Sequence, residues 1–200
     1  MKLYWSPNTR STRALWLMEE AGLPYERVKL DLAAGEHKRP AFLAVNPMGK
    51  VPALENGAAK VAESAALCAY VADLAPASGL APPIGDPDRG RFLHWLFFSA
   101  GCIEPAYMQK AMGWTIDRPS LAGWGGYEAV MDVLDAAVAP GPWLLGDRFT
   151  AADVMVGTDL HFGVRLFKFV ESRPNFEAYI DRCEARPAFQ RAAAINAAGV

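Results

Sequence analysis

The sequence predicts a small α/β domain followed by an all-helical domain. Residues 1–75 combine short strand-like alternations with helical spacing, whereas residues 87–200 repeat apolar side chains at helical spacing only. Between them, residues 76–86 are rich in proline and glycine, which is typical of a linker. The chain has 200 residues, 52% of them hydrophobic. This is enough to bury a sizeable core, as one domain or as two small ones.

Residues 2–32 are predicted to form a strand, a helix and a second strand. Apolar and polar residues alternate in "KLYW" and again in "ERVKLDL". Between these runs, apolar residues recur at helical spacing: Ala14, Leu17, Met18 and Ala21. Gly22 is placed to end this helix as a C-cap residue, and Pro24 prevents its continuation. A right-handed crossover would make the two strands parallel.

A short helix, a hairpin and a longer helix are expected next. "PAFLAV" predicts the short helix, and Asn56-Gly57 is a two-residue connection that favours a tight hairpin. From Glu63 onward, one face of a helix is apolar: Leu67, Cys68, Val71 and Leu74. The run "NPMGKVPAL" before the hairpin is unusual, because Pro52 removes a backbone donor where a strand ladder would use one.

The second half is predicted to be a helical bundle. The helical runs are "DRGRFLHWLFFSAGCI", "GYEAVMDVLDAAV", "TAADVMVGTDLHFGVRLF", "NFEAYIDRCEA" and "AFQRAAAI". Apolar stripes such as Tyr127, Val130, Met131 and Leu134 indicate helices packed on helices. Pro105 should kink the first run. Thr150 and Asp153 form a capping box, with Phe149 and Val154 as its hydrophobic staple, so we expect Asp153 to be buried and structural.

Charge, cysteine and histidine content exclude several kinds of protein. Twenty basic and 22 acidic residues give a net charge of −2, which provides no surplus for binding polyanions. No apolar run approaches the roughly 20 residues of a membrane span, and the start lacks the pattern of a signal peptide, so we expect a cytoplasmic protein. The three cysteines and three histidines are scattered, which argues against a disulfide framework and against a metal site.

Four runs of sequence are similar to those of one known family. They are "NTRSTRALWLMEEAGLPYE" near the start, "NPMGKVPAL", "ESAALCAYVAD", and "LLGDRFTAADVMVG" in the helical half. Over nearly the whole chain the sequence resembles the cytosolic glutathione transferase family, and its start is similar to that of many bacterial members. The resemblance implies a thioredoxin-like domain of order βαβ-α-ββα over 1–75 and an all-α domain over 87–200. It also implies glutathione as cosubstrate and a homodimer.

The resemblance implies that the Val51-Pro52 turn binds glutathione. In the family the bond before this proline is cis, which an X-Pro bond adopts at a cost of only about 0.5 to 1 kcal/mol. A cis bond would turn the N–H and C=O of Val51 away from the ladder, where they can pair with an extended peptide. The alternative is that Pro52 only begins an edge strand, where proline is tolerated.

The two charged ends of glutathione have candidate partners on either side of this turn. Glu63 and Ser64 stand at a helix start, where the positive dipole end favours a carboxylate and Glu63 can hold an ammonium group. A simple capping arrangement is the alternative. Lys50 would pair with the glycyl carboxylate at the other end. Lys38 and His37 are weaker candidates for that role, and a solvated surface role suits them better.

Catalysis requires a donor that lowers the pKa of the glutathione thiol, which is ordinarily about 8.5. In the family this donor lies between the first strand and the first helix, where this chain reads "SPNTRS". Thr9 matches a serine of the similar bacterial sequences and is the first candidate, followed by Ser11, with Ser6 and Asn8 as further donors. Either of the first two hydroxyls can instead act only as a helix cap. The cysteine of one bacterial class would fall at Arg10, which argues against that class.

The expected reaction is addition of the glutathione thiolate to a small hydrophobic electrophile, with no metal or redox cofactor. Tyr4 is expected to pack rather than to react. The second substrate would contact aromatic and thioether side chains: Trp95, Phe98, Tyr107, Met108 and Trp114. Two alternatives remain open. One is a glutathione-dependent isomerase, dehalogenase or peroxidase, and the other is a non-catalytic, glutathione-binding regulatory relative.

Overall fold

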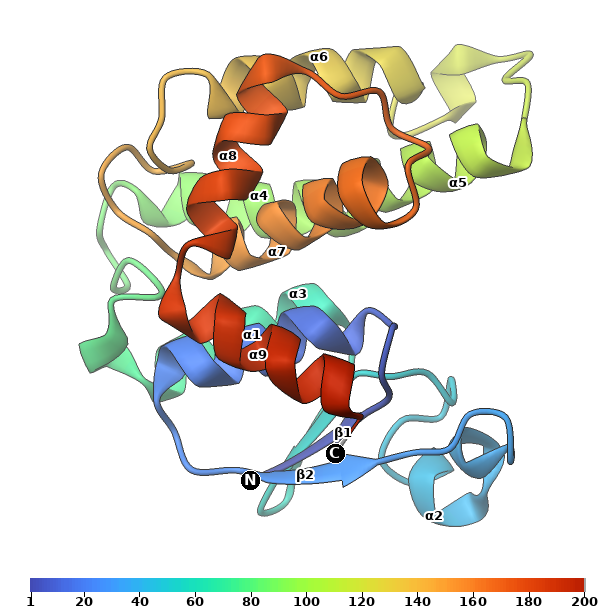
Figure 1. Cartoon of the computed structure of the whole chain (residues 1–200), viewed down its shortest axis with the longest axis vertical. Coiled ribbons are helices and arrows are strands. Elements are labelled where there is room, and N and C mark those ends of the chain that lie inside the picture. The colour runs from blue at the N-terminus through green and yellow to red at the C-terminus, as the bar shows by residue number, and fades with distance from the viewer. Residues whose placement is uncertain (200) are drawn as a thin grey trace. The chain divides into compact units, whose positions relative to one another are not determined.

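The computed structural model describes residues 1–199, except the side chain of Pro119, and contains two compact units (Figure 1). The first unit comprises Met1–Leu80 and the chain from Arg186 onward, and the second comprises Ala81–Ala185. The sequence-based division at 1–75, 76–86 and 87–200 grouped the last helix with the helical half. In the structure this helix, α9 (Pro187–Ala198), belongs to the first unit instead.

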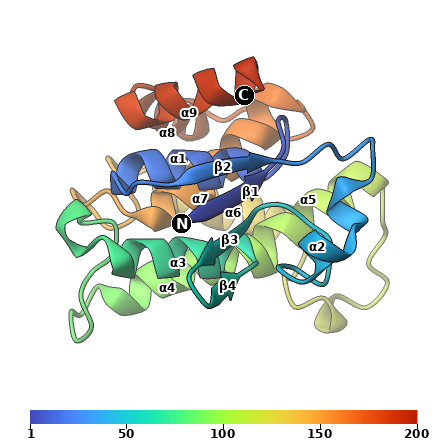
Figure 2. The same cartoon turned by 90° about the horizontal axis from the view of Figure 1, so that it is seen from below.

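The first unit is built on a four-stranded mixed sheet in the order β2-β1-β3-β4 (Figure 2). The central strand β1 (Lys2–Trp5) pairs parallel with β2 (Glu26–Lys29) and antiparallel with β3 (Ala53–Asn56). β3 in turn pairs antiparallel with β4 (Ala59–Val61). This sheet and its helices confirm the fold class predicted for the first half of the chain.

Helices of the first unit begin and end near their predicted positions. They are α1 (Ser11–Ala21), α2 (Pro40–Leu43), α3 (Ser64–Leu74) and α9, with short 3-10 turns at η1 (Glu36–Lys38) and η2 (Pro76–Ser78). Every residue of α1 from Ser11 to Met18 is buried, because α1 contacts both α3 and α9. Gly22 ends α1 with a φ of 64°, and its N–H donates to the Met18 carbonyl at 3.1 Å.

Two details of this unit differ from the sequence prediction. The register pairs Asn56 with Ala59, so the hairpin loop is Gly57-Ala58 rather than Asn56-Gly57. Gly57 occupies the first position of this loop with a φ of +59°. Tight hairpins require a positive φ there, and glycine adopts it at no steric cost. Leu74 is 40% exposed, so the buried face of α3 ends earlier than its apolar pattern suggested.

The second unit is a helical bundle, as predicted. Its α-helices are α4 (Arg89–Phe98), α5 (Glu104–Met112), α6 (Tyr127–Val138), α7 (Ala151–Leu160) and α8 (Pro174–Glu184), and a 3-10 turn, η4, spans Pro119–Leu121. All residues of α7 are buried, and the helix contacts both α4 and α8. The predicted stripe of α6 is also buried.

The prediction of uniform helical spacing in this unit is wrong at two places. Two π-helical segments, η3 (Ser99–Ile103) and η5 (His161–Leu166), continue α4 and α7. Pro105 follows η3 in the first turn of α5. Because proline lacks an N–H and crowds the carbonyl four residues earlier, a wider turn ahead of it relieves the conflict. Gly163 of η5 has no space for a side chain, since an added Cβ would lie 2.9 Å from the Tyr107 ring.

The capping box at the start of α7 forms as predicted. Asp153 is fully buried, and its carboxylate accepts hydrogen bonds from the Thr150 N–H at 2.8 Å, the Leu144 N–H at 2.9 Å and the Tyr179 hydroxyl at 2.7 Å. Burial raises the pKa of Asp153, while these donors act in the opposite direction. The carboxylate therefore joins the loop before α7 to α8, which is a structural role.

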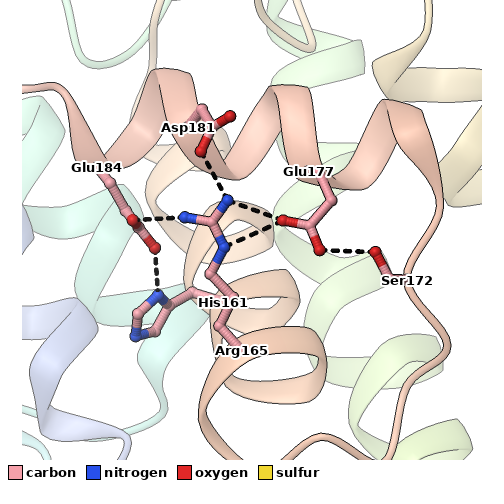
Figure 3. Close-up of polar contacts among 6 residues, drawn as sticks. All are labelled: His161, Arg165, Ser172, Glu177, Asp181 and Glu184. Carbon is pink, nitrogen blue, oxygen red and sulfur yellow. Dashed lines mark hydrogen bonds and ion pairs between the residues drawn. The ribbon is translucent and has the colours of Figure 1, made fainter.

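An arginine on η5 ties this segment to α8 (Figure 3). The Arg165 guanidinium lies 2.8 Å from Glu177, 2.6 Å from Asp181 and 2.6 Å from Glu184. Two further side chains complete the network: His161, whose Nδ1 is 2.8 Å from Glu184, and Ser172, whose hydroxyl donates to Glu177 at 2.6 Å. Burial lowers the pKa of Arg165, but the hydrogen bonds to Asp181 and Glu177 outweigh this effect and raise it.

Candidate active site

The Val51-Pro52 turn lies immediately before the ladder of β3. The peptide bond is cis, as predicted, and Pro52 is buried while Val51 is half-buried. Pairing between β1 and β3 begins at Ala53, opposite Tyr4, so Val51 precedes the paired residues. The backbone N–H and C=O of Val51 therefore lie outside the ladder.

The sheet register brings three predicted parts of the site to one edge. Ala53 pairs with Tyr4, so the turn before β3 and the loop after β1 lie at the same edge of the sheet. Leu54 pairs with Val61, so the residues after β4, which lead to Glu63, reach this edge as well. Antiparallel pairing thus gathers segments that are far apart in the sequence.

Asn46 fixes the shape of the turn. This side chain is 4% exposed, its Nδ2 donates to the Lys50 carbonyl at 2.8 Å, and its Oδ1 accepts from the Met48 N–H at 3.1 Å. The Gly49 N–H also donates to the Asn46 carbonyl at 2.9 Å. Sequence reasoning missed this residue, although an asparagine before proline is a known signal of a turn.

Gly49 lets a second basic residue reach the turn. Its φ is +60°, and an added Cβ would lie 2.7 Å from the His37 carbonyl oxygen and 3.0 Å from the Lys38 Nζ. Lys38 therefore lies against the turn that carries Lys50, and its Nζ is 3.4 Å from the Met48 carbonyl. Within residues 1–199, the buried Nδ1 of His37 has no hydrogen-bond partner.

Glu63 precedes α3 in an unusual backbone conformation. Its φ of 65° and ψ of 119° lie in a region that residues other than glycine rarely adopt, at a cost of roughly 1 to 3 kcal/mol. The side chain is exposed, and Ser64, the first residue of α3, is half-buried. The first N–H groups of a helix have no intrahelical partner, so this end of α3 suits an anion.

The loop after β1 places Thr9 and Ser11 side by side. The Thr9 hydroxyl is 2.7 Å from the Ser6 carbonyl and 2.9 Å from the Ser11 Oγ, and it accepts a bond from the Ser11 N–H at 3.1 Å. Thr9 is half-buried, whereas Ser11 is fully buried and its Oγ accepts from the Ser6 N–H at 3.4 Å. Thr9 is therefore the better placed of the two to reach a ligand.

Among the other candidate donors of this region, Ser6 is buried and Tyr4 is bonded elsewhere, whereas Asn8 is exposed. Ser6 is 7% exposed, and Asn8 is exposed with a positive φ of 56°. The Tyr4 hydroxyl donates to Glu55 at 2.9 Å, and its ring centroid is 5.4 Å from that of Phe42. Burial and the bond to Glu55 raise the pKa of Tyr4. These contacts agree with the packing role expected for Tyr4.

The side chains expected to line the second substrate differ in their surroundings. Trp95 and Tyr107 are buried, and the Tyr107 hydroxyl donates to the Asp159 carbonyl at 3.1 Å, so both belong to the core. Trp114 is 53% exposed and, with Trp124, lines a cavity of about 390 Å³. Sequence reasoning missed Trp124, because nothing in the pattern shows that the chain folds back there.

The described residues contain no group of three or more histidine, cysteine, aspartate or glutamate side chains that could hold a metal ion. Cys68 and Cys183 are buried, and burial raises the pKa of the Cys102 thiol. Within the same residues, no helix has both the length and the apolar character needed to cross a bilayer.

The chain combines a sheet unit that has a cis-proline turn with a helical bundle. Comparisons with known proteins identify the family that has this architecture. The model of the glutathione S-transferase N-terminal domain matches residues 1–73, and that of the C-terminal domain matches residues 119–182. Glutathione S-transferase F9 of Arabidopsis thaliana is 30% identical over 97% of this chain and 96% of its own length. The chain belongs to the glutathione S-transferase family.

Solved structures of relatives have the same fold. A sphingomonad glutathione S-transferase, solved in complex with glutathione, is 31% identical with a TM-score of 0.82, over 98% of this chain and 99% of its own. A glutathione transferase from Methylococcus capsulatus is 33% identical with a TM-score of 0.80, over 98% of each chain. This similarity over both units confirms the predicted combination of a thioredoxin-like and an all-α part.

Proposed function

We propose that this protein is a glutathione transferase that binds reduced glutathione, ionises its thiol and adds the thiolate to a small hydrophobic electrophile. The observation that carries this proposal is the meeting of the Val51-Pro52 turn, the start of α3 and the loop after β1 at one edge of the sheet. Family membership supports it. In this proposal, residues 1–75 form the glutathione-binding domain, 76–86 the linker and 87–200 the helical domain, except that α9 lies in the first compact unit.

The binding roles follow from the charges of the tripeptide. The Val51 N–H and C=O would pair with its cysteinyl backbone as an added strand. Ser64 and the N-terminus of α3 would receive the γ-glutamyl carboxylate, and Glu63 the ammonium group beside it. Lys50, joined by Lys38, which lies against the same turn, would face the glycyl carboxylate.

Thr9 is proposed as the donor that stabilises the thiolate. Its hydroxyl has one proton, which is directed to the Ser6 carbonyl or the Ser11 Oγ in this arrangement, so it must rotate to donate to sulfur. The thiol proton leaves to solvent, the sulfur forms a bond to the electrophilic carbon, and a leaving group such as chloride departs with its electron pair.

Retention on immobilised glutathione, combined with turnover of a chlorinated nitroaromatic compound, tests the function. We expect retention, and chloride release that depends on glutathione. Retention without turnover of this compound would favour the isomerase, dehalogenase or peroxidase reactions, or a regulatory relative. A chain that neither is retained nor gives a calorimetric signal with millimolar reduced glutathione would overturn the proposal.

The thiol donor is tested by ultraviolet titration of the bound thiol in Thr9→Ala and Ser11→Ala. We expect Thr9→Ala to raise the thiol pKa and Ser11→Ala to act mainly on stability, because Ser11 is fully buried. If neither variant raises the thiol pKa, the assignment of the donor is wrong.

We further propose that the chain is a bacterial, cytoplasmic member of the family and a homodimer. The similarity of its start to bacterial sequences and the bacterial solved relatives support a bacterial origin. Light scattering of the purified protein tests whether it is a homodimer.

A further inference from the structure

The C-terminal helix α9 is bonded through one amide to the loop proposed to activate the thiol. Asn196 Oδ1 accepts from the Asn8 N–H at 2.9 Å and from the Thr12 hydroxyl at 3.2 Å, and Asn196 Nδ2 donates to Asn8 Oδ1 at 3.3 Å. We propose that Asn196 is a positioning residue for thiol activation. It would act by holding the loop that presents Thr9, and this inference rests on the proposed function.

Asn196 forms hydrogen bonds to residues that lie before and after Thr9 in the sequence. Asn8 directly precedes Thr9, and Thr12 follows three residues later. The single proton of the Thr12 hydroxyl is shared between Asn196 Oδ1 and the Thr9 carbonyl, which is 3.1 Å from the Thr12 oxygen, so this side chain lies between Asn196 and the backbone of Thr9. A change in the position of the Asn196 amide is therefore transmitted to Thr9 from two directions.

The backbone of Asn8 gives this contact a conformational effect. Asn8 has a φ of 56°, a left-handed conformation that asparagine tolerates better than most residues but does not favour. Asn196 binds both the N–H and the side-chain oxygen of Asn8, and so stabilises this conformation. Without it, the loop can relax to other conformations, and the Thr9 hydroxyl loses a fixed position relative to α1.

Other contacts hold α9 against α1 far from this loop. Arg186 pairs with Glu20 at 2.6 Å, and Arg191 pairs with Glu19 at 2.7 Å. The Phe189 ring packs edge-on against Trp16, with centroids 5.1 Å apart. Because these contacts do not involve Asn196, its substitution should loosen the loop and leave α9 docked. Arg191→Ala is the matched control, since it weakens docking of the same helix at the other end of α1.

The test compares the full-length wild type, Asn196→Ala and Arg191→Ala. Three quantities are measured: the dissociation constant of reduced glutathione by calorimetry, the pKa of the bound thiol by ultraviolet titration, and the melting temperature. We expect Asn196→Ala to raise the pKa of the bound thiol by about one unit. This is the shift that follows when the thiolate loses the net stabilisation of roughly one hydrogen bond. At acidic pH, where the bound thiol stays protonated, the dissociation constant should change less than about twofold, because none of the groups proposed to bind glutathione contacts Asn196.

Arg191→Ala should lower the melting temperature and leave the thiol pKa unchanged. An unchanged thiol pKa in folded Asn196→Ala, or an equal shift in both variants, would overturn the inference. If Asn196→Ala does not fold, Thr12→Val removes only the linking hydroxyl, and an unchanged thiol pKa in that variant has the same meaning. A wild-type chain that does not bind glutathione is recognised in the first measurement and contradicts the proposed function instead.

Discussion

Glu63→Gly should make the protein more stable and glutathione binding weaker. Glu63 has a φ of 65°, which glycine adopts without steric cost. Replacement by glycine removes a backbone strain of roughly 1 to 3 kcal/mol and costs about 0.4 to 1 kcal/mol, because glycine increases the conformational entropy of the unfolded chain. The net gain is therefore about 0 to 2.6 kcal/mol, and its midpoint of about 1.3 kcal/mol raises the melting temperature by roughly 3 to 5 °C for a chain of this size.

The loss of affinity in the same variant comes from the carboxylate. A hydrogen bond to a charged group contributes about 1.5 to 3 kcal/mol, which is roughly a 10- to 150-fold weaker dissociation constant for glutathione. Glu63→Gln separates the two effects, because it keeps the side chain's shape and the strained backbone but loses the charge. It should bind glutathione nearly as weakly as Glu63→Gly and melt close to the wild-type temperature.

Thermal unfolding and calorimetric titration with reduced glutathione measure both effects on the same three proteins. The two properties should move in opposite directions in Glu63→Gly, a pattern that general damage to the fold does not produce. A lower melting temperature in Glu63→Gly would refute the argument from strain. Wild-type affinity in Glu63→Gln would refute the role of the charge.

Three other predictions concern the turn, the capping box and the arginine network. Gly49→Ala should weaken glutathione binding in calorimetry, because the added carbon would lie 2.7 Å from a neighbouring backbone oxygen; unchanged affinity would contradict this. Asp153→Ala should lower the free energy of unfolding in denaturant by about 3 to 5 kcal/mol, since it leaves buried donors unpaired, and a loss below about 1 kcal/mol would disprove it. Hydrogen bonds from Ser172 and Arg165 lower the pKa of Glu177, so its stabilisation should be present above the unfolded-state pKa and be lost as pH falls through the folded one. In Arg165→Met, the free energy of unfolding should depend less steeply on pH in this acidic range, as measured by acid unfolding.

The elements of the sheet unit could be predicted because their signals are local. Alternation in "KLYW" and helical spacing before Gly22 need no knowledge of distant residues. The position of α9 could not be predicted, since its buried face, with Ala188, Phe189 and Ala192, could pack equally well on the bundle. The π-helical segments were also missed, because one wider turn leaves the apolar pattern of the flanking helices almost unchanged.

The candidate site could be predicted where a residue type is tied to a backbone requirement. Proline before a strand and an acid-serine pair at a helix start are such positions. The contributions of Asn46 and Asn196 depend on which carbonyls and N–H groups lie within reach of an amide, and this is fixed only by the fold. The sequence placed Thr9 ahead of Ser11 only through the resemblance to bacterial sequences. The physical difference between them, the full burial of Ser11, is fixed by the fold.

Binding and activation should respond differently to sequence change at this site. The groups proposed to bind glutathione are the backbone of Val51 and the start of α3, together with side chains beside them, and their positions are set by the sheet register. Activation is assigned to a single hydroxyl that already contacts Ser6 and Ser11 and is held by a loop tied to α9. Small shifts of that loop change which partner receives the hydroxyl proton without moving Val51 or Glu63. Variants of residues 6–12 should therefore alter the thiol pKa and the rate over a wide range, while the affinity for glutathione with a protonated thiol stays nearly constant.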